Sequence, residues 1–173
     1  MLHKTYRKQY NVGGGFLIPI NMYGQHDSFS EEYSHVIPAL IRKFVDAVDY
    51  NEPVVKCWGT GTASREFLYA GDCAEVIVKA VLSELDYPEP INIGTGKEIF
   101  IKDLAILIAK LTGFEGDNVF TREVSDGQPR RQLDVSRAKH LLGWEAKTSL
   151  EEGLKTTIEW YKQNKDKILE KDE

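Results

Sequence analysis

His35 is the first residue whose type and position suit chemistry, because it follows a polar loop and opens a predicted helix. A neutral imidazole at a helix N-terminus lies near the positive end of the helix dipole, and imidazole suits proton transfer near neutral pH. We expect an acid–base role for His35; the alternative is a half-buried histidine that hydrogen-bonds the loop before it. Other polar side chains in this loop are Asn21, Tyr23, His26 and Asp27.

Trp58 and Arg65 lie on either side of a Gly-Thr-Gly-Thr turn. A nucleotide needs a flat surface for its base and cations for its phosphates, and an indole and a guanidinium supply these. The pair therefore indicates nucleotide binding. The alternative leaves Trp58 in the core and pairs Arg65 with Glu66.

The turn over residues 126–131 carries an acid and two adjacent guanidinium groups. Asp126 could hold a ribose hydroxyl while an arginine holds pyrophosphate. The same Asp-Gly and Gln-Pro pairs also suit a plain turn with solvated arginines. Arg42 and Lys43, on the helix behind His35, either reach a phosphate or form the solvated face of that helix.

The elements that must position these residues alternate between helices and strands, which predicts the α/β class. Helices are expected over residues 1–10, 34–47, 72–85, 101–112, 136–142 and about 150–164, and strands over 16–19, 53–58, 65–69, 91–93 and 118–121. The strand over 16–19 is apolar and is expected to be a buried parallel strand. Residues 20–33 are expected to form a loop.

Several helix ends carry a local signal. Ser34 and Asp72 are expected N-caps, and Gly113 is expected to end the helix before it. Ser149 and Glu152 have the spacing of a capping box. The helix after Asp72 has apolar side chains at helical spacing, namely Ala74, Ile77, Val78, Val81, Leu82 and Leu85.

The composition predicts one ordinary globular unit, with 173 residues of which 42% are hydrophobic and 28% charged. The net charge of −5 argues against nucleic acid as a partner, because phosphate binding needs clustered Lys and Arg. Cys57 and Cys73 are isolated and indicate reduced structural thiols rather than a disulfide or metal site. The N-terminal apolar run is short and split by Pro19, so we expect neither a signal peptide nor a membrane span, and a cytoplasmic location.

No segment reads as the phosphate-binding loop of a dinucleotide domain. A complete doubly wound domain begins with a strand and a glycine-rich loop, whereas this chain opens in a predicted helix. The Gly-Thr-Gly at 94–96 lacks a third glycine, and the Gly-Thr-Gly at 59–61 leads into a strand. We therefore expect a chain without the N-terminal dinucleotide-binding βαβ units.

Taken together, these segments resemble the GDP-L-fucose synthases, which are extended short-chain dehydrogenases/reductases with a Rossmann-type fold. Tyr-Gly and Gly-Thr-Gly are shared by many sugar-nucleotide epimerases and dehydratases. His-Asp-X-Phe followed by Ser-His-Val-Ile-Pro-Ala-Leu-Ile-Arg is more specific to the fucose synthase branch. The matching segments span nearly the whole chain and lie at 19–29, 34–44, 58–68, 92–96 and 126–136.

This resemblance implies epimerisation of GDP-4-keto-6-deoxy-D-mannose at C3 and C5, followed by NADPH-dependent reduction to GDP-L-fucose. It makes His35 the acid that works with a cysteine base, and it places His35 close to the nicotinamide. The residues it implies for packing against the cofactor are Pro19, Ile20, Asn21 and Met22. The residues it implies for contacts to the GDP-sugar are Lys43, Trp58, Arg65 and Asp126.

The family's catalytic tyrosine and lysine are not matched, because Tyr6 is followed four residues later by Tyr10. By the resemblance, that pair, the cysteine base and the glycine-rich loop all lie upstream. Residues 1–33 are then expected to be a residual helix, strand and loop of the cofactor domain. Residues 34–173 are expected to be mainly the substrate-binding domain, with a returning Rossmann strand near 90–94.

We therefore expect the substrate-binding C-terminal portion of such an enzyme, without turnover on its own. The resemblance implies a homodimer for the complete enzyme. A different nucleotide-sugar epimerase or dehydratase is an alternative. Another alternative is a non-catalytic GDP-sugar-binding or assembly module from a split or truncated gene, which docks through exposed strand edges.

Overall fold

The computed structural model describes residues 2–11, 13–83, 89–121 and 126–172. It is an α/β structure with parallel strand pairs, as predicted. The helices are α1 (Leu2–Tyr10), α2 (Val36–Asp49), α3 (Ala70–Leu82), α4 (Ile101–Thr112), α5 (Ser136–Leu142) and α6 (Leu150–Asp172). The strands are β1 (Leu17–Pro19), β2 (Asn21–Tyr23), β3 (Val54–Trp58), β4 (Ser64–Tyr69), β5 (Ile91–Ile93), β6 (Glu98–Phe100), β7 (Asp117–Thr121) and β8 (Arg130–Arg131).

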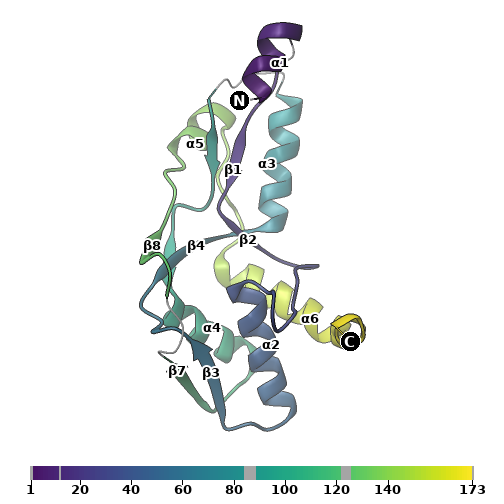
Figure 1. Ribbon diagram of the computed structural model, residues 1–173, viewed down its shortest axis with the longest axis vertical. Helices are drawn as coiled ribbons and strands as arrows, with labels where there is room; N and C mark the ends of the chain where they lie inside the picture. The colour runs from purple at the N-terminus through teal and green to yellow at the C-terminus, as the bar shows by residue number, and fades with distance from the viewer. Residues whose placement is uncertain (1, 12, 84–88, 122–125, 173) are drawn as a thin grey trace.

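Strand β4 runs through the middle of the molecule and links its two ends (Figure 1). It pairs in parallel with β2 and β8 and antiparallel with β6. One end holds α1, α3, α5 and the parallel pair β1–β5, while the other holds α2, α4, α6 and the parallel pair β3–β7 (Figure 1). Residues on β4 can therefore face ligands that extend between the two ends.

Each end has its own hydrophobic core. The larger cluster joins α2, α4 and α6 and buries Phe44, Ile41, Leu104, Ile108 and Tyr161. The smaller cluster lies where β4, α3 and β5 meet and buries Leu68, Val76, Ile91, Ile93 and Trp144. Burial of such side chains contributes roughly 1.5–3 kcal/mol each, so both ends are held by packing.

The predicted ends of two helices are confirmed. Gly113 follows α4 with a φ of 85°, in the left-handed region where a side chain would be strained. At α6, the Ser149 N–H donates to Glu152 Oε2 at 3.0 Å and the Glu152 N–H donates back to Ser149 Oγ at 3.2 Å. The Ser149 hydroxyl also donates to Glu152 Oε2 at 2.6 Å, and this bond and the one from the Ser149 N–H lower the pKa of Glu152. Helix α6 runs to Asp172, so the predicted end near residue 164 was wrong.

Three predictions near the candidate site were wrong. His35, not Ser34, is the N-cap residue of α2, and the buried Ser34 hydroxyl has no hydrogen-bond partner among the described residues. The predicted loop over 20–33 contains strand β2. This strand has only three residues, which is too short for an alternation of apolar and polar side chains to be recognised in the sequence. Strand β1 is parallel to its neighbour β5, as expected of a parallel strand, but it is not buried: Leu17 is half-buried and Ile18 is 38% exposed.

Helix α3 differs most from its prediction. It begins at Ala70, so Asp72 lies inside its first turn and is not its N-cap; the predicted end at Leu85 is outside the described residues. The helix buries Cys73 and Val76. The apolar stripe faces outward instead, with Ile77 48%, Val78 56%, Val81 75% and Leu82 74% exposed. Helical spacing identifies an apolar stripe but not whether the chain itself covers it.

Candidate functional site

His35 lies in a pocket of about 420 Å³ between the end of β2, the start of α2 and the middle of β4. The pocket is lined by residues 21–27 and 35–38 together with Arg65, Phe67 and Ala70. The structure therefore brings His35 and Arg65 together although 30 positions separate them in the sequence. None of the described helices is long and apolar enough to cross a membrane.

Helix α2 presents His35 at its N-cap position. Its backbone is extended, with φ −73° and ψ 168°, and its carbonyl accepts the Ala39 N–H at 3.0 Å. The imidazole makes no capping bond and is exposed, so the alternative of a half-buried histidine is wrong. An imidazole in this position is open to a bound molecule.

The four residues predicted to contact a cofactor lie in different surroundings. Asn21 and Met22 line the pocket beside His35, and Met22 is exposed. The Asn21 side-chain amide donates to the Glu66 carbonyl at 2.9 Å, which ties β2 to β4. Ile20 points into the smaller core, and Pro19 ends β1 outside the lining of this pocket.

A second pocket, of about 500 Å³, lies on the other side of the α2 N-terminus and shares Val36 with the first. Trp58 lines it and is 61% exposed, so the alternative that places Trp58 in the core is wrong. Lys43 Nζ lies 4.8 Å from the centre of the Trp58 ring and donates to the Lys56 carbonyl at 3.0 Å. This arrangement offers a flat ring with one cation held over one of its faces.

Arg65 points toward the first pocket and not toward its neighbour Glu66. Its guanidinium donates to the Ser64 carbonyl at 2.7 Å and to the Asp126 carbonyl at 3.2 Å. The alternative that pairs Arg65 with Glu66 is therefore wrong. The bond to Asp126 brings the 126–131 turn beside Arg65.

The Asp126 carboxylate closes the Gly-Thr-Gly-Thr turn. It accepts the Thr60 N–H at 2.7 Å and also the Thr60 hydroxyl. These bonds lower the pKa of Asp126, with a smaller contribution from Arg65. A Cβ on Gly59 would come within 2.2 Å of this carboxylate, so only glycine fits there. Asp126, which was predicted to bind a ribose hydroxyl, therefore already holds the loop that follows Trp58.

Sequence reasoning did not single out Arg131 from its neighbour Arg130. Strand β8 pairs with β4 so that Arg131 lies opposite Arg65, on the same face of the sheet. Arg130 lies opposite Ser64 and is bound instead to Glu98, with Nε 2.8 Å from Oε2. Only the strand register distinguishes the two arginines, and no local sequence signal carries it.

Sequence reasoning also missed Glu66. Its carboxylate is fully buried and accepts the N–H groups of Thr95 at 2.6 Å, Gly96 at 2.7 Å and Leu133 at 2.8 Å. Successive N–H groups of this kind can form an anion-binding concavity. The Gly-Thr-Gly loop at 94–96 is therefore filled by an internal carboxylate, and a phosphate has no room there.

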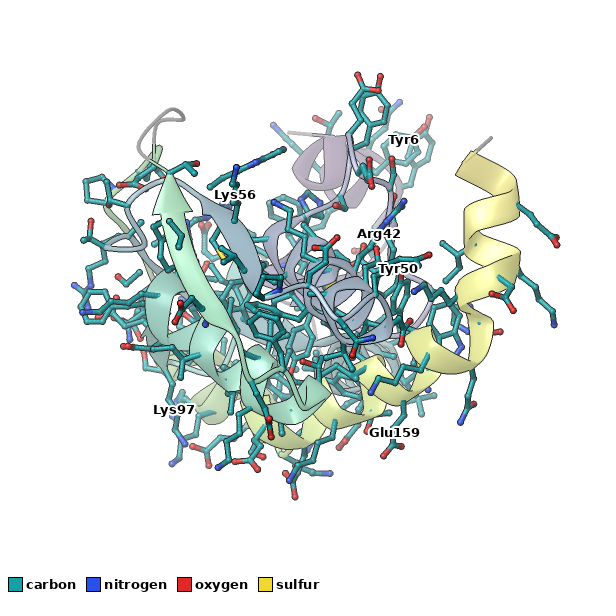
Figure 2. All side chains as sticks on the ribbon, turned by 90° about the horizontal axis from the view of Figure 1, so that it is seen from below. Tyr6, Arg42, Tyr50, Lys56, Lys97 and Glu159 are labelled. Carbon is teal, nitrogen blue, oxygen red and sulfur yellow. The ribbon has the colours of Figure 1, made fainter. Side chains whose placement is uncertain are left out.

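Arg42 neither forms the solvated face of its helix nor is free to reach a phosphate. Its side chain is only 13% exposed and donates to the Phe29 carbonyl at 2.9 Å, with an ion pair to Glu31 at 3.3 Å. In the view of Figure 2, Arg42 lies toward the middle of the molecule, whereas Lys97 and Glu159 lie at its margin. Arg42 therefore anchors the loop between β2 and α2.

The cysteines agree with their predicted structural role. Both Cys57 and Cys73 are free and buried, and burial raises the pKa of each thiol. Among the described residues no group of His, Cys, Asp and Glu side chains could hold a metal ion.

The chain is similar to known proteins whose names refer to GDP-linked sugars. GDP-L-fucose synthase of Escherichia coli (strain K12) is 42% identical over 175 residues, covering 96% of this chain and 54% of the relative. A GDP-L-fucose synthetase structure from Naegleria fowleri has a TM-score of 0.81 at 26% identity, covering 95% of this chain and 51% of that one. MlghC, a GDP-mannoheptose C4 reductase from Campylobacter jejuni with NADP bound, has a TM-score of 0.75 at 31% identity, covering 93% and 56%.

The chain spans about half the length of the curated relatives it matches. The family model described as NAD dependent epimerase/dehydratase family matches residues 1–94, which is more than half of the 173 residues. This match and the α/β fold agree with each other. The chain belongs to the NAD-dependent epimerase/dehydratase family.

Proposed function

We propose that this chain is the substrate-binding part of a GDP-L-fucose synthase-like enzyme, which epimerises GDP-4-keto-6-deoxy-D-mannose at C3 and C5 and reduces it with NADPH. The single observation that carries the proposal is a chain of contacts between the two pockets. Asp126 holds the loop that follows Trp58 and also accepts a hydrogen bond from Arg65, which lines the His35 pocket. The name of the E. coli relative supports the choice of GDP-sugar.

In this proposal each part of a GDP-sugar meets a different surface. Guanine stacks on the exposed Trp58 ring beside Lys43, since a base stacked on an aromatic ring gains about 1–3 kcal/mol. The pyrophosphate lies between Arg65 and Arg131, which share one face of the sheet. The sugar then enters the pocket that holds His35.

His35 would act as the acid of the epimerisation. When a proton leaves the carbon beside the ketone, the substrate becomes an enolate, and His35 returns a proton to that carbon from its N–H group. Because Cys57 and Cys73 are buried, neither is the partner base. That base would come from outside the described residues, as the resemblance implies.

The described residues fit one end of the cofactor. Asn21 and Met22 line the pocket next to His35 and would hold the nicotinamide, which supplies the hydride when NADPH is bound. The Gly-Thr-Gly loop at 94–96 cannot cradle the cofactor's phosphates because Glu66 already fills it. Turnover by this chain alone is therefore not expected, and purified chain with substrate and NADPH should consume no NADPH.

Binding of GDP tests the nucleotide part of the proposal. Calorimetric titration should show that the chain binds GDP more tightly than UDP, and that Trp58→Ala weakens GDP binding by about 5- to 150-fold, the equivalent of a lost base stack. Tyr50→Ala is the matched control, because Tyr50 is another exposed aromatic ring with a lysine, Lys165, 5.4 Å away. Equal loss in both variants, or a preference for UDP, would contradict the proposal.

A second function, assembly with a separate cofactor-binding part, is favoured by two observations at the end of the molecule that holds α3. The outward apolar stripe of α3 lies near the exposed Phe16, and residues 13–17 line a cavity with Ile77, Ala80 and Val81. Among the described residues, β1 and β5 pair with each other and with no further strand, although parallel sheets are normally buried on both faces. We propose that the part of the relatives that this chain does not match covers this surface.

Co-expression tests the assembly. The chain should co-purify with the unmatched N-terminal part of the E. coli relative, and Val81→Asp should reduce recovery of the pair at least tenfold, because a buried unpaired charge costs several kcal/mol. Ile106→Asp is the matched control, since Ile106 is 59% exposed on α4 at the other end of the molecule. If the pair forms as well with Val81→Asp as with Ile106→Asp, another surface makes the contact.

A further inference from the structure

We infer that Glu66 and Glu98 are positioning residues that hold Arg131 opposite Arg65, so that the two arginines bind a pyrophosphate group together. The inference rests on the proposed function for the identity of the ligand. Glu66 and Glu98 lie on the face of the sheet that points away from the His35 pocket. The proposed function assigns no ligand contact to that face.

Strand alternation separates the arginines from the acids. Side chains on β4 point to opposite faces in turn, so Arg65 faces one side while Ser64 and Glu66 face the other. On the neighbouring strands, Arg131 lies opposite Arg65, and Glu98 lies opposite Glu66. The sheet thus has an arginine face toward the ligand and an acid face behind it.

Glu66 fixes the chain just after Arg131. It accepts the Leu133 N–H through Oε2 at 2.8 Å, while Oε1 accepts the N–H groups of Thr95 and Gly96. A fully buried carboxylate is stable only when hydrogen bonds satisfy it, so these bonds are strongly favoured together. The position of Leu133, two residues beyond Arg131, is therefore tied to β4.

Glu98 fixes the chain just before Arg131. Its carboxylate accepts Arg130 Nε at 2.8 Å and Ser64 Oγ at 2.8 Å, which joins β6, β8 and β4. Hydrogen bonds from Arg130 and Ser64 lower the pKa of Glu98, so it stays ionised near neutral pH. Gln132 adds a bond from its side-chain amide to the Gly96 carbonyl at 2.6 Å. Arg131 is thus held on both sides.

This much support is needed because β8 has only two residues and brings like charges together. Opposed like charges on neighbouring strands repel each other, and Arg65 and Arg131 are such a pair. Without the acids, β8 would relieve the repulsion by leaving β4. A dianionic pyrophosphate between the arginines instead benefits from their fixed spacing, since bidentate geometry strengthens the interaction.

A double-mutant cycle tests the inference with inorganic pyrophosphate as the probe. Glu98→Gln is expected to weaken pyrophosphate binding by about fivefold, within the usual range of coupling between neighbouring groups. Arg131→Ala should then cost much less in the Glu98→Gln chain than in the wild type. Lys43→Ala, in the Trp58 pocket, should cost the same in both and is the control for a general structural effect.

Glu66→Gln should give the same pattern with a larger loss; Glu98→Gln decides the matter if Glu66→Gln does not fold, because Glu98 is partly exposed. Additive losses for Glu98→Gln and Arg131→Ala, or a wild-type chain that does not bind pyrophosphate, would overturn the inference. If pyrophosphate binding shows the coupling but GDP and UDP bind equally, the proposed function fails while this inference stands.

Discussion

Replacement of His35 by glutamine is expected to lower the rate of epimerisation by about 10²–10⁴-fold, the usual contribution of a positioned acid or base. Glutamine keeps a polar side chain at the N-cap of α2 but has no proton to give at neutral pH. The measurement is incorporation of solvent deuterium at C3 and C5 of the sugar, made with this chain assembled with the N-terminal part of the E. coli relative.

The chain provides a matched control in its other pocket histidine. His26 also lines the His35 pocket, but its ring lies 4.7 Å from the Trp160 ring, centre to centre. His26→Gln should therefore keep the deuterium incorporation within a few-fold of the unaltered enzyme. The proposed role of His35 fails if His35→Gln incorporates deuterium normally, or if both variants lose it equally while circular dichroism shows an intact fold.

Residues whose chemistry is local were predicted well from the sequence. Gly113 and the Ser149–Glu152 capping box act within one turn of their helices, so their spacing alone identifies them. His35 could be placed at a helix start for the same reason, although the N-cap was taken to be Ser34. The exposure of Trp58 was left open, because a strand-end tryptophan suits a core and a binding surface equally.

Residues whose partners are distant in sequence were not predicted. Glu66 was considered only as a partner of the adjacent Arg65, whereas it binds Leu133, 67 positions away. Arg131 became distinct from Arg130 only through the register of β8 on β4. Side-chain type shows that a carboxylate needs donors but not which segment supplies them.

Which side of α3 faces the core could not be predicted from the sequence either. Its apolar stripe was visible in the sequence, but the stripe is exposed and the opposite side of the helix is buried. The spacing of apolar side chains indicates which side of a helix needs to be covered. It does not show whether the covering segment lies within the 173 residues. The stripe therefore favours a protein contact, which the Val81→Asp test examines.

Asp72→Ala is expected to destabilise the chain by about 2–4 kcal/mol, because it leaves several donors without their acceptor. Although predicted as the N-cap of its own helix, Asp72 is buried in α3 and holds the segment that leads into α6. Its Oδ2 accepts the N–H groups of Lys147 and Thr148, each at 2.9 Å, and its Oδ1 accepts the Thr148 hydroxyl at 2.8 Å. Guanidinium chloride unfolding measures the loss of stability.

Asp72→Asn separates the hydrogen bonds from the charge. The asparagine oxygen can accept both backbone N–H groups, and its NH₂ can donate to the Thr148 oxygen, since a hydroxyl accepts as well as donates. We therefore expect a loss of only about 1 kcal/mol for this variant. Equal losses for the two variants would show that the charge matters more than the bonds. An Asp72→Ala chain as stable as the wild type would show that α6 is held in place by the packing of Leu154 and Tyr161 in the larger core alone.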